Sequence, residues 1–388
     1  MNLPAIQSAL RERNLDAWLF YDHHHRDPIA YRVLGLPQNL MVTRRWFYLI
    51  PAEGGPRKLV HKIEAGHLDS LPGEKRSYAA WQELADGLKQ MLGGCRNIAM
   101  QYSPNNGIFT ISLVDGGTLE LVRGLGKNVV SSGDLVALFE AVLTDAQVES
   151  HFAAQDAVDR ITAAAFAEIG RRARNGGTTE FEMQQWILEA FRRENLTAAD
   201  PPVVATNHNS GDPHYGPSST KSEPIGEGDF VLLDIWAKKN QPDAVYYDIT
   251  WTGSVGKAPS DRVVEAFRAV RDARDSGARF VRESIAAGTA IAGYQVDQAV
   301  RARIKLAGLD SHFVHRTGHS IGTEVHANGA NMDDLEIHDE RRIVPNSLFS
   351  IEPGVYFPDF GVRSEINMLV RSHGAEVTGR MQNEVVII

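Results

Sequence analysis

The chain has 388 residues, 43% of them hydrophobic, and its 49 acidic residues outnumber 40 lysines and arginines, for a formal net charge of −9. This length exceeds one typical domain and the composition can bury a large core, which excludes a mainly disordered protein. No basic run is long enough to follow a phosphate backbone, so we expect no nucleic-acid partner.

The first part of the chain, from Leu15 to about Leu143, alternates short apolar runs with helical stretches. AWLFY (17–21), RWFYLIP (45–51) and RKLVH (57–61) indicate strands, and SYAAWQELADGLKQML (77–92) contains a helical pattern. This alternation predicts an α/β domain.

Two helices are predicted next. An amphipathic segment runs from Asp145 to Arg174 and ends at the glycines of RNGG. A second helix follows directly and is opened by a capping box of Thr179 and Glu182. The loop after it (201–218) is too rich in Pro, Asn, Gly and Ser to be regular. We place the domain boundary at residue 145, where the first of these two helices begins.

The remaining segments alternate strands and helices. FVLLDIWA (230–237) and AVYYDITWTG (244–253) read as strands around the turn-forming cluster KKNQPD. Helices are predicted over about 260–287 and 293–306. SLFSIEPGVYF, VRSEINMLVR and NEVVII, which lie between residue 347 and the end of the sequence, read as strands.

Each of two predicted hairpins carries a pair of acids. Directly opposed residues in a hairpin share a constant index sum, so Asp234 opposes Asp248 if the turn centres on Gln241. By the same rule, Glu352 opposes Glu365 if the turn lies inside PDFG. Opposed like charges destabilise a strand pair unless a cation offsets them. All four acids could instead face water on an exposed sheet, but Asp234 follows the apolar run FVLL and Glu352 follows LFSI, so we favour a metal site.

The segment HRTGHSIGTEVH (315–326) holds three histidines. Four carboxylates and one histidine form a hard, oxygen-rich ligand set, which suits two divalent ions of the Mn(II) type, with Co(II), Fe(II) or Zn(II) as competitors. Two such ions can share a hydroxide and clamp the oxygens of a displacement. The reaction class predicted from the residues is metal-assisted hydrolysis.

Other motifs favour other sites less well. A Gly-x-Ser-x-Gly match at 318–322 would make Ser320 a nucleophile, but no buried strand precedes it. His315 and His319 as a lone zinc pair lack the glutamate of a zincin helix. The run His23–His25 resembles a metal-binding histidine cluster. Adjacent side chains point in different directions, however, so we expect a loop there.

Five motifs, in this order, resemble the pita-bread metallohydrolases, which include prolidase, aminopeptidase P, methionine aminopeptidase and creatinase: LLDIWA, VYYDITWTG, HRTGHSIGTEVH, FSIEPGVYF and GVRSEI. The resemblance covers about residues 150–388, and the upstream part is similar to the N-terminal domain of the prolidase and creatinase branch. It implies an α/β (α+β) fold with a creatinase/prolidase-like domain at 1–145 and a pita-bread catalytic domain at 146–388.

The resemblance also implies roles for single residues. Two divalent ions, Mn(II) first, would be held by five ligands: Asp234, Asp248, His319, Glu352 and Glu365. Glu352 would also shuttle the proton. The family's substrate-side histidines fall on His214, His315 and His326, which we expect to be catalytic, and Arg363 is expected to bind substrate.

Two departures from the family pattern concern the substrate. The first motif usually reads Asp-x-Gly, and here Trp236 replaces the glycine. The separation of Asp234 from Asp248 is also longer than usual. Strand alternation puts Trp236 on the face of Asp234, so we expect Trp236 to narrow the substrate site or to pack behind it.

The resemblance implies a dinuclear metallopeptidase, an Xaa-Pro aminopeptidase or dipeptidase, that cleaves the bond before proline in short peptides by attack of a metal-bound hydroxide. Trp236 and the longer hairpin suggest an alternative, a non-peptide amide C–N hydrolase on the same scaffold. A non-catalytic binding protein is less favoured because all five ligand positions are filled. A homodimer is expected.

Location is predicted from composition. The single cysteine, Cys95, excludes an intramolecular disulfide and is typical of a reducing compartment. The N-terminal stretch lacks the apolar centre of a signal peptide, and no apolar run reaches the roughly 18 residues of a membrane span. We expect a soluble, cytoplasmic protein that binds no membrane.

Overall fold

The structure, a computed structural model, describes residues 1–388. The chain divides into two compact units, Met1–Glu140 and Ala141–Ile388. The sequence-based boundary at residue 145 falls on the first residue of helix α6 (Asp145–Ala173). No helix combines the length and the apolar character that crossing a lipid bilayer requires.

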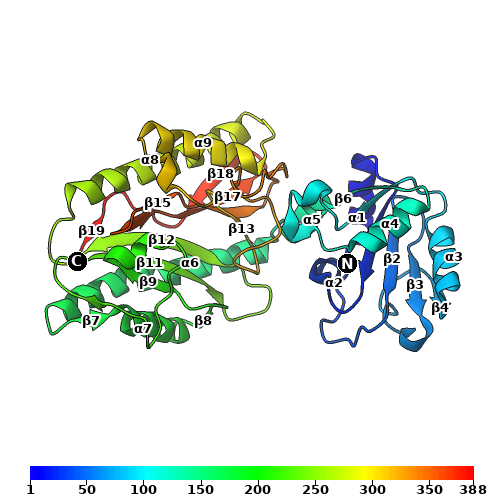
Figure 1. Cartoon of the computed structure of the whole chain (residues 1–388), viewed down its shortest axis with the longest axis horizontal. Helices are drawn as coiled ribbons and strands as arrows, with labels where there is room; N and C mark the ends of the chain where they lie inside the picture. Colours follow the sequence, from blue (N-terminus) through cyan, green and yellow to red (C-terminus); the bar gives the residue numbers. More distant parts are fainter. The chain divides into compact units, whose positions relative to one another are not determined.

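Unit 1 is built on a six-stranded sheet in the order β4-β3-β2-β1-β5-β6 (Figure 1). Alternate residues of β1 enter two different cores: Trp18 and Phe20 join one, and Leu19 and Tyr21 join the other. Both faces of the sheet are therefore buried, which explains the continuous apolar runs. Its strands and helices are β1 (Ala17–Asp22), β2 (Trp46–Pro51), β3 (Arg57–His61), β4 (Glu74–Tyr78), β5 (Asn97–Met100), β6 (Asn128–Ser131), α1 (Leu3–Glu12), α2 (Pro28–Leu34), α3 (Trp81–Met91), α4 (Gly116–Gly124) and α5 (Gly133–Glu140).

Unit 2 places its strands between two pairs of helices (Figure 1). On one side lie α6 and α7 (Glu180–Arg193), and on the other lie α8 (Asp261–Ala286) and α9 (Gly293–Leu306). The capping box predicted for Thr179 and Glu182 is confirmed at the start of α7. The predicted helices 260–287 and 293–306 correspond to α8 and α9.

The strands of unit 2 form several small sheets. The two that concern the site have the orders β19-β12-β11-β8, with β9 added beside β11, and β13-β14-β17-β18. The strands are β7 (Thr178–Thr179), β8 (Leu196–Thr197), β9 (Val203–Thr206), β10 (Pro224–Ile225), β11 (Phe230–Lys239), β12 (Tyr247–Ser254), β13 (Ser320–Ile321), β14 (Leu348–Ile351), β15 (Gly354–Tyr356), β16 (Gly361–Arg363), β17 (Ile366–Arg371), β18 (Gly374–Thr378) and β19 (Val386–Ile387).

Strand alternation decides which side chains of β11 face the site. Val231, Leu233 and Ile235 pack in the core that α6 and α7 share with β11 and β12. Because side chains alternate along a strand, Asp234 and Trp236 point to the opposite face. The first acid of the predicted ligand set is therefore directed away from the α6–α7 core.

The predicted register of the first acidic hairpin is wrong by two residues. Asp234 pairs with Thr250, and Asp248 pairs with Trp236. The connection is not a symmetric turn around Gln241, because β11 continues past the hairpin and pairs Lys238 and Lys239 with β8. The two acids still share a face as diagonal neighbours, which in such ladders lie about 7–8 Å apart.

The predicted register of the second acidic hairpin is confirmed. Ile351 pairs with Ile366 on one side of the two glutamates, and Gly354 pairs with Arg363 on the other, and both pairs have the predicted index sum. The turn is tight, since the Phe357 amide donates to the Phe360 carbonyl at 2.8 Å. Glu352 and Glu365 therefore lie opposite each other between two short ladders.

Candidate metal centre

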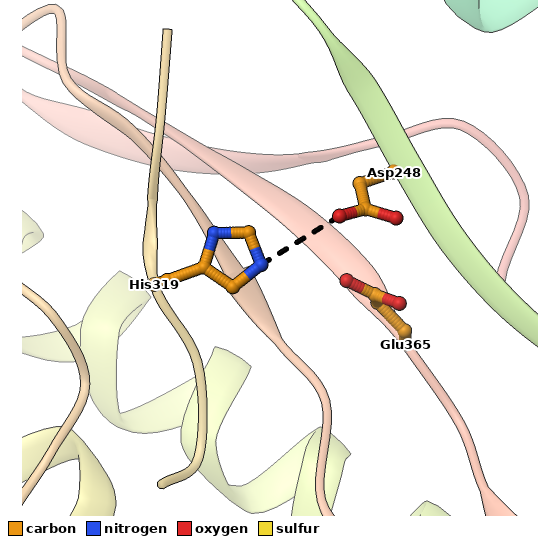
Figure 2. Close-up of side chains that lie close together, drawn as sticks. All are labelled: Asp248, His319 and Glu365. Atoms are coloured by element: carbon orange, nitrogen blue, oxygen red, sulfur yellow. Dashed lines mark ion pairs between the residues drawn. The ribbon is translucent and has the colours of Figure 1, made fainter. Parts of the chain in front are cut away.

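Three of the five predicted ligands converge on one point. Figure 2 shows Asp248 from β12, His319 from the segment before β13, and Glu365 from the junction of β16 and β17 pointing toward one another. One ligand atom from each lies within 4.8 Å of the others. His319 Nε2 is 3.6 Å from Asp248 Oδ2, and all three residues are buried.

His319 is oriented by its neighbours in the chain and in the sheet. Its Nδ1–H donates to the Ser320 carbonyl at 3.2 Å, which leaves the Nε2 lone pair directed toward the carboxylates. Gly318 allows the close approach to β14 that this requires, because a Cβ at that position would lie 2.0 Å from the Ser350 carbonyl oxygen. The imidazole is thus in the tautomer that a metal ligand needs.

Glu352 lies on the other side of the same imidazole. Its Oε1 is 3.3 Å from His319 Nε2 and accepts the hydroxyl proton of Ser350 at 3.1 Å. Ser350 also accepts the His319 amide at 2.9 Å, so one hydroxyl connects the two predicted ligands. The Glu352 amide donates to the Thr317 carbonyl at 2.7 Å, which fixes the strand end.

Asp234, the fifth predicted ligand, is paired with Arg363. The Arg363 guanidinium donates to Asp234 Oδ2 and, at 3.0 Å each, to the hydroxyls of Thr250 and Tyr356. Thr250 in turn donates to Glu365 at 2.8 Å. Arg363 is predicted to bind substrate. In this structure its buried guanidinium connects Asp234, through Thr250, to Glu365.

The electrostatics of the cluster follow from its burial. Burial, with the negative charge of Glu352, raises the pKa of Asp248 well above its usual range. Burial and the charge of Asp248 do the same to Glu365. For Asp234, burial raises the pKa to about 7 against the opposing effect of Arg363. Glu352 differs, because His319, His315 and Arg363 offset its burial and lower its pKa.

The donor set fits divalent cations. Asp248 Oδ1 and Glu365 Oε1 are buried and accept no hydrogen bond, although buried polar atoms almost always have a partner. Clustered buried carboxylates repel one another, and a cation between them removes both the repulsion and the missing contacts. Asp234, Asp248, His319, Glu352 and Glu365 would be the residues that hold the ions.

The other two histidines of the segment are placed differently. The rings of His326 and His319 are 4.3 Å apart at 88°, so His326 lies directly beside the cluster. His315 is engaged at both nitrogens: Nδ1–H donates to the Arg316 carbonyl at 2.7 Å, and Nε2 accepts from the Tyr356 hydroxyl at 2.8 Å. In this structure His315 supports Tyr356.

Two other predicted residues, His214 and Trp236, form no side-chain hydrogen bond or ion pair with the ligands. His214 is exposed in the loop after β9. Trp236 lies directly across from Asp248, and its ring packs on an apolar cluster that includes Tyr246 and Ile321. Its indole nitrogen is buried and has no partner.

The Ser320 alternative does not fit the observed backbone. Ser320 lies in the two-residue strand β13, which pairs with β14, and no helix follows it. A nucleophile elbow requires a strand-to-helix turn that exposes the hydroxyl, whereas Ser320 Oγ is buried without a partner. The prediction that His23–His25 form a loop is confirmed, since they follow β1 outside any regular element.

Three residues of the site were not predicted from the sequence: Thr250, Ser350 and Tyr356. Each is an uncharged hydroxyl that links two predicted residues, and such residues have no distinctive spacing. Thr250 could have been found, because it alternates with Asp248 on the same face of β12. Tyr356, buried between His315 and Arg363, could be identified only from the folded arrangement.

Comparison with protein families gives a match to the model of metallopeptidase family M24 over residues 153–372. A Mycoplasma pneumoniae protein provisionally named Xaa-Pro aminopeptidase is 32% identical over 200 residues, 51% of this chain and 52% of the relative. The chain thus aligns with about half the length of that relative. A Mycobacterium tuberculosis protein provisionally named dipeptidase PepE is 28% identical over 348 residues, 88% of this chain and 84% of its own.

Solved structures extend the likeness to the whole chain. The crystal structure of dipeptidase PepE from Mycobacterium ulcerans superimposes with a TM-score of 0.73 at 26% identity, and the match covers 100% of this chain and 96% of that one. The predicted fold, an α/β N-terminal unit followed by a pita-bread unit, is confirmed by this likeness.

Proposed function

Because the chain belongs to metallopeptidase family M24, we propose that it hydrolyses Xaa-Pro bonds of short peptides with divalent ions held by the five predicted ligands. The predicted family and enzyme class, a metallopeptidase, are confirmed by the family match. The names of the relatives, an Xaa-Pro aminopeptidase and dipeptidases, support the substrate class.

One observation carries the proposal: the buried cluster of Asp248, His319 and Glu365, with two carboxylate oxygens that no donor satisfies. Placing several carboxylates close together in a buried site destabilises the folded protein, and such an arrangement is typical of a functional site. When bound, divalent ions at such a cluster act as Lewis acids and lower the pKa of water toward neutrality.

Proton transfer and transition-state stabilisation would be carried out by side chains of the protein. Glu352, whose pKa is lowered by His319, His315 and Arg363 against the effect of burial, is ionised at neutral pH and would accept the proton of the attacking water. It would then deliver that proton to the prolyl nitrogen. An amide nitrogen must be protonated to leave as an amine, and because the prolyl nitrogen carries no N–H in the peptide, the donated proton becomes the N–H of the released proline.

His326 would stabilise the developing oxyanion. Burial, followed by the neighbouring His319 ring, lowers the pKa of His326 to about 4. It is therefore neutral at pH 7 and offers one N–H as a hydrogen-bond donor without adding positive charge beside the ligands. His214 would approach the substrate from the loop after β9, where it is exposed.

We propose Mn(II) as the metal, with Co(II), Fe(II) or Zn(II) as alternatives, because the ligand set is four carboxylates and one imidazole. The homodimer, the cytoplasmic location and the absence of nucleic-acid and membrane partners stay predictions from the sequence.

The substrate is tested with a panel of Xaa-Pro dipeptides, longer peptides beginning with Xaa-Pro, and non-peptide amides, each assayed with Mn(II) supplied. We expect turnover of at least one Xaa-Pro class and none of matched peptides with alanine in place of proline. Hydrolysis of the amides alone would contradict the proposal.

That last outcome would support a second candidate, a non-peptide amide hydrolase. Trp236 favours it, because this large side chain lies directly across from Asp248 where the family usually has glycine. A Trp236→Gly variant tests whether this side chain influences substrate choice. If the indole only packs on the apolar cluster around Tyr246, the order of substrates in the panel stays the same; if it shapes the substrate site, the order changes.

A further inference from the structure

Glu180 is a buried carboxylate without a cation. It is the first residue of α7, it is 0% exposed, and it forms no ion pair. Four donor groups surround it: the amides of Thr206 and Glu223 at 2.7 and 2.8 Å, the Asn209 side chain at 3.0 and 3.1 Å, and the Tyr215 hydroxyl. Every donor comes from residues 206–223.

Residues 206–223, here called the 206–223 segment, also pack against the candidate site. The Gly361 amide donates to Ser210 Oγ at 2.9 Å. A Cβ at Gly211 would lie 2.2 Å from the Phe357 carbonyl oxygen, so the backbones approach as closely as glycine allows. The segment therefore rests on the β15–β16 hairpin, whose strands carry Tyr356 and Arg363.

A buried charge is tolerated only when hydrogen bonds replace its lost hydration. The donors to Glu180 come from both ends of the segment, Thr206 and Glu223, and from its interior. The start of α7 adds the favourable field of a helix N-terminus. The Glu180 carboxylate thus binds both ends and the interior of the segment, whereas the half-buried Asp229 binds only Asn207 at its start.

We infer that Glu180 is a positioning residue: it fixes the 206–223 segment on the β15–β16 hairpin and thereby places His214 at the substrate side of the metal centre. The role of His214 rests on the proposed function. The role of Glu180 in ordering the segment does not, so the two are tested by different measurements.

The structural test is hydrogen–deuterium exchange of the metal-loaded protein. Glu180→Gln keeps the shape but replaces one acceptor oxygen with a donor, so amides within 206–223 should exchange faster. Gln184→Ala is the matched control, because Gln184 is buried one turn later on α7 and donates to the Pro202 carbonyl, outside the segment. Unchanged exchange in Glu180→Gln, or equal acceleration in the control, overturns the inference.

The kinetic test is a double-mutant cycle on the proline peptide that the panel identifies. Glu180→Gln should lower kcat/KM about tenfold, the scale expected when one buried hydrogen-bonding group loses its partner, with bound metal unchanged. In the His214→Ala background the same substitution should have little effect. An equal loss in both backgrounds means that Glu180 does not act through His214 and overturns that step.

Tyr215→Phe keeps the test decisive if Glu180→Gln does not fold. It removes one donor from the interior of the segment and leaves the carboxylate with its other three partners. Faster exchange within 206–223 supports the inference, and unchanged exchange contradicts it. If no peptide is turned over by the wild-type protein, the proposed function fails while the exchange result still decides the role of Glu180.

Discussion

His326→Ala is expected to lose about 10²–10³-fold in kcat, the usual effect of deleting one oxyanion donor, while its metal content stays that of the wild type. His319→Ala should lose bound metal, and activity with it. The two rings are only 4.3 Å apart, so proximity alone does not distinguish them. The difference follows from orientation, because His319 Nε2 faces Asp248 and Glu352.

His315→Ala is the control for this pair. Both of its ring nitrogens are engaged within the protein, so the variant should keep its metal and lose activity more mildly through the freed Tyr356 hydroxyl. Metal analysis and kcat of the three purified variants decide the assignment. Full metal content in His319→Ala, with metal lost from His326→Ala or His315→Ala, would reverse the roles given to these histidines.

Asp248→Asn is expected to abolish metal binding and to leave the fold intact. The backbone of Asp248 is held independently, since its amide and carbonyl both bond to the Asn367 side chain. Without metal, the variant should be more stable than the wild type, because it removes one of several buried carboxylates that repel one another. With metal, the order should reverse.

The reversal has a predictable size. A metal at a thousandfold excess over its Kd stabilises the native state by about 4 kcal/mol, and each kcal/mol raises Tm by about 2–4 °C in a domain of this size. Thermal unfolding of both proteins with EDTA and with Mn(II) measures it. Asp159→Asn is the control, because this partly buried acid bonds to Tyr247 on the opposite face of β12. If Mn(II) raises the Tm of Asp248→Asn as much as that of the wild type, Asp248 is not a metal ligand.

The two acidic hairpins show when strand pairing can be predicted from the constant sum of residue numbers of opposed residues. It succeeds for Glu352 and Glu365, because a tight turn fixes the pairing of both flanking ladders. It fails for Asp234 and Asp248, because β11 continues past the hairpin to pair with β8, which no local pattern indicates. The face of each acid was still predictable, since apolar residues flank Asp234 in β11 and Asp248 in β12 and pack on the opposite side.

The interior contacts of the site were not predictable from spacing. The pairing of Asp234 with Arg363 joins residues from two sheets, and the hydroxyl of Ser350 joins His319 to Glu352. Glu180 could not be singled out from the sequence either. In the sequence it is an ordinary acidic residue in the first turn of a helix, and only the fold surrounds it with donors from a distant loop. The order of motifs along the chain predicts the ligands, and tertiary packing decides what supports them.

We propose that divalent ions at the buried cluster of Asp248, His319 and Glu365 drive hydrolysis of Xaa-Pro bonds. The most direct test titrates Mn(II) into the metal-stripped protein and records bound metal and Xaa-Pro peptide hydrolysis in the same samples. We expect no turnover before metal is added, and activity that rises with bound metal until both saturate. Full turnover by the metal-stripped protein, or saturated metal binding without any turnover, would contradict metal-dependent hydrolysis at this cluster.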